Sequence, residues 1–269
     1  MGPLRVPNTT KIMGILNVTP DSFSDGGLYL KTDLALSHAE ALIKQGADII
    51  DVGGQSTRPG AQSISVEEEI TRVLPVVKAL ATQCKVSVDT YQPEVMKACL
   101  EYPIVMINDV TAMPLSSTRQ MIAKAQVDVV LMHKQGSPLS MQNNPQYEDP
   151  CAEIIEFLSH QVALCEEDGI SKSHIWVDPG IGFGKTLAHN SALLKGLSSL
   201  QQCSPKVLLG ISRKSYFKDL LGIDDVNERI LPSAVVAALA AVQGVAMIRT
   251  HDVQVTYQAL RCAEVFCGE

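Results

Sequence analysis

A short run of β-branched residues, a turn containing Gly or Asp, and a longer amphipathic stretch recur eight times along this 269-residue sequence. Strands that alternate with helices predict a parallel sheet joined by right-handed crossovers. Eight such pairs close an α/β barrel of the (β/α)8, or TIM-barrel, type. The expected strands are Ile12–Asn17, Ile49–Gly53, Val86–Thr90, Ile104–Val110, Val127–His133, Ile175–Asp178, Val207–Ser212 and Ala246–Thr250. The clearest helical patterns are Asp33–Gln45, Val66–Thr82, Pro93–Tyr102 and Ala152–Asp168.

An open, doubly wound sheet is the structural alternative, but it typically has fewer strands and a Gly-rich first turn, and neither feature fits this sequence. Helix boundary signals agree with the barrel: Thr32 or Asp33 can cap the first expected helix, and Gly46 can end it. Ser65 precedes the acidic run Glu67–Glu69, which suits the positive end of a helix dipole. Because no linker or composition shift divides the chain, we expect one domain over residues 1–269.

The composition favours a well-buried globular protein whose ligands are small. Hydrophobic residues make up 46% of the chain and aromatic residues only 4%, a balance that suits parallel strands buried on both faces. The net charge is -7 and no basic block is present, so nucleic acid and anionic membrane surfaces are not expected partners. An anionic ligand would therefore need positive charges that are gathered locally.

The cysteines and the apolar segments predict a cytoplasmic location. The seven cysteines are scattered and form no C-x-x-C pair, which argues against a disulfide framework or a thiolate metal site. Met1–Arg5 has none of the apolar character of a signal peptide. The longest apolar stretch, Ala234–Ile248, is interrupted at Gln243–Gly244, and each piece is too short to span a membrane.

Polar residues stand at the end of every expected strand. In a barrel the carboxyl ends of all strands lie on one face, which is where active sites form. A single strand-end Asp or Asn is more often a turn or cap residue, but eight polar strand ends together favour a functional site. These ends are Asn17, Gly53–Arg58, Asp89, Asn108–Asp109, His133, Asp178, Ser212–Ser215 and Arg249–His251.

The charges on this face predict a ligand with two different ends. Asp89, Asn108 and Asp178 supply acceptors and an amide, which suit a flat heterocycle rich in N–H donors. Positive charge suited to a phosphate or carboxylate comes from Arg58, Lys214, Arg249 and His251. The sequence therefore favours a ligand that is heterocyclic at one end and anionic at the other.

The segment Gly180–Thr186 (GIGFGKT) resembles a Walker A loop without matching it. The first glycine is one residue too close to the Gly-Lys-Thr end, and Pro179 occupies the position that the motif requires to be glycine. We therefore do not expect a nucleotide-binding P-loop.

Five segments together resemble the signatures of the dihydropteroate synthases. They are Asn17–Gly27 (NVTPDSFSDGG), Asp51–Ala61 (DVGGQSTRPGA), Asp178–Lys185 (DPGIGFGK), Ser212–Ser215 (SRKS) and Arg249–Val253 (RTHDV). They follow the order of the family and cover essentially the whole chain, in the manner of the stand-alone bacterial form. The resemblance implies a transferase of folate synthesis that joins 6-hydroxymethyl-7,8-dihydropterin pyrophosphate to 4-aminobenzoate and forms 7,8-dihydropteroate and pyrophosphate.

The resemblance also implies residue roles, with catalysis assigned to Asp89, Asp178, Lys214, Arg249 and His251. The pterin would be held by Asp89, Asn108, Asp178 and Lys214, with Met132 and Val110 lining its slot. The pyrophosphate would be bound by Asn17, Thr57, Arg58, Arg249 and His251, with Asn17 and Asp25 close to Mg2+. The aminobenzoate pocket would be formed by Phe23, Pro59, Phe183, Lys214 and Ser215. Sulfonamides would compete in that pocket, and a homodimer would form through helices late in the barrel.

Three positions depart from the commonest pattern of the family: Gln55 replaces Glu, Lys134 replaces Met, and Thr250 replaces Val. None removes an implied ligand, but Lys134 adds a charge at the barrel mouth. A pterin-dependent methyltransferase is the nearest alternative enzyme, although it would not need the Asp21–Gly27 loop, the Ser212–Ser215 turn or the Arg249 and His251 pair. A catalytically silent pterin-binding paralogue is the alternative from another class, and it predicts losses that this sequence does not have.

Overall fold

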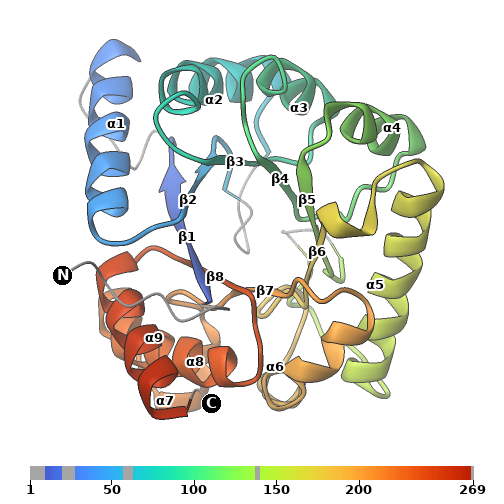
Figure 1. Ribbon diagram of the computed structural model, residues 1–269. Helices are drawn as coiled ribbons and strands as arrows, with labels where there is room; N and C mark the ends of the chain where they lie inside the picture. The colour runs from blue at the N-terminus through green and yellow to red at the C-terminus, as the bar shows by residue number, and fades with distance from the viewer. Residues whose placement is uncertain (1–9, 20–27, 57–62, 137–139, 268–269) are drawn as a thin grey trace.

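Eight parallel strands form a barrel with the helices outside it (Figure 1). The computed structural model describes residues 10–19, 28–56, 63–136 and 140–267. The order of the strands is β6-β5-β4-β3-β2-β1-β8-β7, and a parallel bridge from Val177 to Val207 joins the two ends of this sheet. The strands are β1 (Lys11–Asn17), β2 (Ile49–Gly53), β3 (Val86–Asp89), β4 (Met106–Asp109), β5 (Asp128–Met132), β6 (Ile175–Asp178), β7 (Leu208–Gly210) and β8 (Met247–Thr250). The expected (β/α)8 fold is confirmed.

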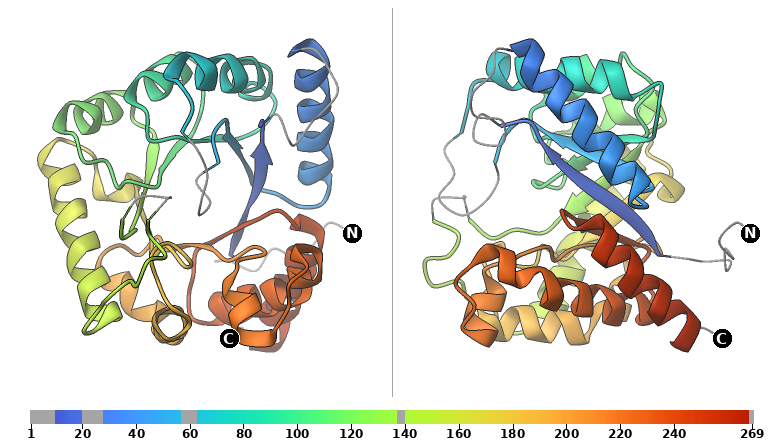
Figure 2. Two further views of the ribbon diagram at one scale, coloured as in Figure 1. Left: turned by 180° about the vertical axis from the view of Figure 1, so that it is seen from behind. Right: turned by 90° about the vertical axis from the view of Figure 1, so that its left-hand side faces the viewer.

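The helices surround the barrel, as both views of Figure 2 show. They are α1 (Leu28–Lys44), α2 (Val66–Leu80), α3 (Pro93–Cys99), α4 (Ser116–Ala125), α5 (Pro150–Glu167), α6 (Leu187–Lys195), α7 (Tyr216–Leu221), α8 (Ile230–Val242) and α9 (Val253–Cys267). In the part of the chain that the structure describes, the connections contain the short 3-10 helices η2 (Lys172–His174), η3 (Leu197–Gln202) and η4 (Val226–Arg229).

The starts of α1 and α2 can be compared with the cap residues that the sequence predicts. Ser65 accepts a hydrogen bond from the backbone N–H of Glu68 and caps α2, as expected. The expected cap of the first helix at Thr32 or Asp33 is wrong, because α1 already begins at Leu28. The residues before Thr32 include two leucines and a lysine, which have good helix propensity and extend the helix past the expected cap.

The strand register pairs residues at the carboxyl ends of neighbouring strands. Asn17 of β1 is paired with Gly53 of β2, which is paired with Asp89 of β3, and Asp89 with Asn108 of β4. On the other side of the barrel, Met132 is paired with Asp178, and Gly210 with Arg249. These polar residues therefore stand at the carboxyl ends of neighbouring strands, on one face of the barrel.

The barrel interior changes from apolar to charged along its axis. Because successive strand residues point to opposite faces, residues two apart share the inward direction. One inward layer is a buried apolar cluster of Met13, Ile49, Met106, Val130, Trp176, Leu208 and Met247. Two residues further along four of these strands stand Asp51, Asn108, Asp178 and Arg249. The apolar layer thus closes the amino-terminal end and forms the floor beneath a charged mouth.

Candidate active site

Arg249 lies among carboxylates at the centre of the barrel mouth. Its Nε donates to Oδ2 of Asp51 at 2.6 Å, and its terminal nitrogen donates to Oδ2 of Asp89, also at 2.6 Å. Oδ2 of Asp51 accepts a second hydrogen bond from Nδ2 of Asn108 at 3.0 Å. The sequence grouped Arg249 with the anion-binding cations, whereas the structure brings it against the acceptors expected for the heterocycle.

The carboxylates at the mouth carry more negative charge than this guanidinium neutralises. Burial raises the pKa of Asp89; the charge of Arg249 opposes this shift, while Asp51 adds to it. Burial alone would lower the pKa of Arg249, but its ion pairs with Asp51 and Asp89 raise it above its ordinary value. The second oxygens of Asp51 and Asp89 are buried without a hydrogen-bond partner. Unsatisfied buried acceptors of this kind suit a ligand that brings N–H donors.

Asp178 lies at the start of the loop between β6 and α6. It is buried, and its Oδ1 accepts a hydrogen bond of 2.7 Å from the backbone N–H of Gly180. Burial raises the pKa of Asp178, while that hydrogen bond and then Lys214 lower it in part. Gly210 of β7 leaves space beside this side chain, since an added Cβ would lie 3.6 Å from Oδ2 of Asp178.

Lys214 connects this loop with the turn that follows β7. Its Nζ lies 4.2 Å from the centre of the Phe183 ring, a cation–π contact. Arg213, the residue before it, has a φ of 53°, so the backbone turns sharply between β7 and α7. Ser215 is the residue immediately before α7. Lys214, Ser215 and Phe183 therefore come from two adjacent loops of the same face.

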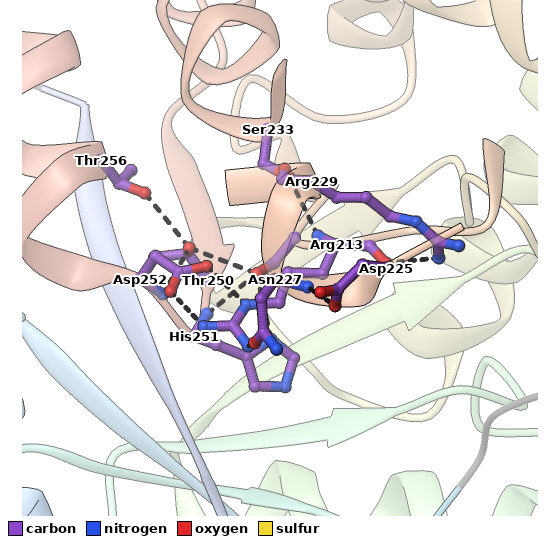
Figure 3. A network of polar contacts seen from close by, with 10 residues as sticks. Arg213, Asp225, Asn227, Arg229, Ser233, Thr250, His251, Asp252 and Thr256 are labelled. Atoms are coloured by element: carbon purple, nitrogen blue, oxygen red, sulfur yellow. Dashed lines mark hydrogen bonds and ion pairs between the residues drawn. The ribbon is translucent and has the colours of Figure 1, made fainter. Parts of the chain in front are cut away.

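A polar network joins the turn after β7 to the turn after β8 (Figure 3). Ser212 lies 3.0 Å from Nδ1 of His251 through its hydroxyl, which also accepts from the backbone N–H of His251. Arg213 donates to both carboxylate oxygens of Asp252. Thr250 accepts from the backbone N–H of Asp252. His251 and Lys214 are thus carried by two turns that are fastened to each other.

Two of the departures from the family pattern meet at Tyr91. The side-chain amide of Gln55 donates to the Tyr91 hydroxyl at 2.9 Å, and Nζ of Lys134 lies 5.8 Å from the centre of its ring. Burial lowers the pKa of Lys134, and the nearby Asp109 raises it in part. The added charge expected at Lys134 therefore lies over an aromatic ring beside β3.

The structure brings together most of the predicted site residues that it describes. Five of them are buried at the ends of β3 to β6: Asp89, Asn108, Val110, Met132 and Asp178. Five further predicted residues lie at strand ends or in the loops that follow strands: Asn17, Phe183, Lys214, Ser215 and His251. Five predicted residues lie outside the described residues: Phe23, Asp25, Thr57, Arg58 and Pro59.

Two charged residues of this region were not predicted from the sequence. Asp51 is an aspartate inside an apolar strand, two residues after the inward-facing Ile49, and this period-two position was the available signal. Lys185 is buried in the loop after β6; it belongs to a family signature and to the failed P-loop, but no role of its own was predicted for it. Asp51 pairs with Arg249 and Lys185 contacts His133, and both partners are distant in the sequence.

The available donors fit a magnesium ion that is held mainly by a substrate. Asn17 presents an amide at the end of β1, and Asp25 lies outside the described residues. Within the described ranges, no group of three His, Cys, Asp or Glu side chains could hold a metal ion. Mg2+ bound to substrate phosphates needs only one or two oxygen ligands from the protein, and the Asn17 amide oxygen is of the kind it accepts.

Comparison with known proteins agrees with this geometry. Residues 13–251 match the family described as pterin binding enzyme. The chain is 46% identical to the dihydropteroate synthase of Escherichia coli (strain K12), over 94% of this chain and 90% of that protein. It is also similar to the crystal structure of Yersinia pestis dihydropteroate synthase with a sulfonamide drug complex, with a TM-score of 0.90, 42% identity and coverage of 98% and 96% of the two chains. Xanthomonas albilineans dihydropteroate synthase with 4-aminobenzoic acid gives a TM-score of 0.89 at 41% identity, with coverage of 96% and 93%. This chain belongs to the dihydropteroate synthase family of pterin-binding enzymes.

Proposed function

We propose that this chain is a transferase that joins 6-hydroxymethyl-7,8-dihydropterin pyrophosphate to 4-aminobenzoate, giving 7,8-dihydropteroate and pyrophosphate. The observation that carries the proposal is the meeting of two kinds of group at one barrel mouth. Buried acceptors with unsatisfied oxygens lie beside a turn bearing Lys214 and a turn bearing His251. A pterin pyrophosphate has the donor-rich heterocycle and the anionic group that such a mouth suits.

The pterin ring is held by Asp89, Asn108 and Asp178 together with Lys214. Each of these three acceptor side chains is at least nine-tenths buried, so a charge-assisted hydrogen bond to an amino-pyrimidine edge would form away from water. Met132, with Val110, provides an apolar wall for the ring. Binding would replace the Asp89 contact of Arg249 with ligand N–H donors and release the guanidinium toward the anionic end.

The anionic and aromatic substrates occupy the outer part of the mouth. The pyrophosphate is bound by Asn17, Thr57, Arg58, Arg249 and His251, and the aminobenzoate by Phe23, Pro59, Phe183, Lys214 and Ser215. Mg2+, held by Asn17 and Asp25, would neutralise charge on the pyrophosphate. Sulfonamides, which mimic 4-aminobenzoate, would compete for the same pocket.

The chemistry begins with loss of pyrophosphate from the pterin methyl carbon. As the C–O bond breaks, its electron pair leaves with the pyrophosphate oxygen, and positive charge builds on the pterin. Asp89 and Asp178 stabilise that charge, while Arg249 and His251 stabilise the departing anion. The arylamine nitrogen then attacks the methyl carbon and loses a proton. Exclusion of water prevents capture of the cation.

The direct test is Mg2+-dependent pyrophosphate release from the pterin pyrophosphate, with and without 4-aminobenzoate. Release coupled to dihydropteroate formation supports the proposed reaction. Absence of release with tight pterin binding would instead favour the methyltransferase or the silent paralogue. Bound pyrophosphate beside a released pterin in crystals would support early C–O cleavage, whereas a strict requirement for aminobenzoate before any cleavage would contradict it.

The working form is a cytoplasmic homodimer that associates through α8. Leu231, Val235, Leu239 and Val242 are exposed along one side of α8, while Ala234, Ala237 and Ala240 are buried on the other. A helix that is apolar all round is normally covered on both sides. In support of a reducing compartment, all seven cysteines are free thiols. Within the described residues, no helix combines the length and hydropathy needed to cross a membrane.

A further inference from the structure

Lys185 is a buried lysine that the proposed chemistry does not use. It lies between Gly184 and the first residues of α6, and only 3% of it is exposed. Its ammonium nitrogen lies 3.0 Å from the carbonyl oxygens of Gly180 and Phe183. It also lies 3.0 Å from Nδ1 of His133 and 3.4 Å from the carbonyl oxygen of that residue. Lysines are almost never buried to this extent unless their charge is compensated. Burial lowers the pKa of Lys185 to about 7, the charge of Asp178 raises it in part, and the nitrogen is surrounded by backbone oxygens.

His133 at the end of β5 completes this arrangement as an acceptor. Burial and, to a smaller extent, the charge of Lys185 together lower the pKa of His133 to about 3. The ring is therefore neutral at physiological pH, and its Nδ1 can accept a hydrogen bond from Nζ of Lys185. The ring packs edge-on against Phe157, with centroids 5.0 Å apart, which fixes its orientation. Lys185 thus connects the loop after β6 to His133 at the end of β5.

The loop held by Lys185 packs closely against the segment that follows β5. Gly180 and Gly184 have φ values of 66° and 65°, and an added Cβ would lie 1.9 Å from the carbonyl oxygen of His133 and 2.4 Å from that of Gln135, respectively. The hydroxyl of Tyr147 donates to the carbonyl oxygen of Gly184 at 3.0 Å. The backbone of this loop is therefore held by hydrogen bonds from both Lys185 and Tyr147.

Phe183 lies inside the segment that these contacts define. Its carbonyl oxygen accepts from Lys185, and its ring lies 4.2 Å from the ammonium of Lys214. A change in the backbone at Phe183 would move both the ring and the contact that orients Lys214. By contrast, Asp89 and Asn108 stand on β3 and β4, away from this loop.

We propose that Lys185 is a positioning residue for the aminobenzoate half of the site, where its buried ammonium sets the place of Phe183 and, through it, of Lys214. The inference rests on the proposed function, because the aminobenzoate pocket belongs to that proposal. Lys185 does not touch the reacting atoms; it acts through the backbone of the loop after β6. Its removal should therefore affect the two substrates unequally.

The test is Lys185→Met, which keeps an unbranched apolar chain as far as the ε position and removes the ammonium. We expect the KM for 4-aminobenzoate to rise by about 10-fold or more, since small misplacements of a binding group have large kinetic effects. The KM for the pterin pyrophosphate should rise by a smaller factor, because Asp89 and Asn108 stand on β3 and β4, and only Asp178 and Lys214 contact the loop that Lys185 holds. Lys195→Met, at the exposed end of α6, is the matched control and should leave both values unchanged.

A second variant keeps the test decisive if Lys185→Met does not fold. Tyr147→Phe retains the ring and removes only the hydrogen bond to Gly184, so it should raise the aminobenzoate KM by about 3-fold and leave the pterin KM unchanged. Equal rises in both KM values, or no rise in a variant that melts like the parent, would overturn the inference. Failure of the parent enzyme to form dihydropteroate would instead overturn the proposed function, which separates the two results.

Discussion

At the scale of single residues, Asp89 illustrates a conflict between binding and stability. Because burial raises its pKa, the unfolded chain loses this proton at lower pH than the folded chain does. The contribution of Asp89 to stability is therefore fully present at low pH and is lost as pH rises through its folded pKa. Asp89 thus occupies a position where its charge is unfavourable to the fold, which is typical of a functional carboxylate.

Replacing Asp89 by Asn should separate these two effects. We expect Asp89→Asn to weaken pterin binding by on the order of 100-fold, since a buried charged hydrogen bond is lost. The same variant should be more stable than the parent at pH 8, by on the order of 1–3 kcal/mol, with the difference shrinking as pH falls toward 4. Urea unfolding at several pH values and pterin-binding calorimetry measure the two quantities. Lower stability of the variant at pH 8 would show that the ion pair with Arg249 stabilises the fold by more than the burial of the Asp89 charge destabilises it.

Lys214 is the residue at which the two substrates are expected to meet. Lys214→Ala should reduce kcat/KM for both the pterin pyrophosphate and 4-aminobenzoate, because losing such a charged contact costs about 2–5 kcal/mol. The control is Lys218→Ala on α7, whose exposed ammonium pairs with the exposed Asp224. Steady-state kinetics with each substrate varied in turn gives the comparison. Activity of Lys214→Ala within a few-fold of the parent would contradict this placement.

At the scale of elements, the turns after β7 and β8 act as one unit. Arg213 and Asp252 are partly buried and form a bidentate pair, whereas the Lys218–Asp224 pair nearby is exposed. We expect Asp252→Asn to lower the free energy of unfolding by about 1–3 kcal/mol, and Asp224→Asn to change it by less than about 0.5 kcal/mol. Thermal unfolding followed by circular dichroism tests this. Equal effects of the two substitutions would show that the junction of the turns is no stronger than a surface pair.

The elements were easier to predict than the contacts between them. The eight strands follow from short β-branched runs, and the shared face of Asp89, Asn108 and Asp178 follows from the barrel rule alone. The start of α1 was missed because Thr32 is a good cap that the neighbouring residues override. The ion pair of Asp51 with Arg249 joins residues 198 positions apart, and no local pattern encodes it. Likewise, the burial of Lys185 depends on carbonyl oxygens whose direction only the folded loop determines.

At the scale of the whole molecule, α8 is the place where the barrel would meet a second copy. Figure 1 shows α8 and α9 next to each other on the outside of the barrel, with α4 on the opposite side. Val235 and Leu239 lie in the middle of the exposed apolar side of α8, and 51% and 59% of their surfaces are accessible. Covering such a stripe against its copy removes apolar surface from water at about 25 cal/mol per Å2.

Charge placed in the middle of this stripe should therefore separate the copies. Light scattering should give twice the mass of one chain for the parent, and the mass of one chain for the double variant Val235→Glu, Leu239→Glu. Leu115→Glu at the start of α4 changes an equally exposed leucine and should leave the mass unchanged. The proposed active-site residues all belong to one chain, so the separated variant should still bind pterin. A parent that has the mass of a single chain would contradict association through α8, and a double variant that stays at twice that mass would move the interface to another face.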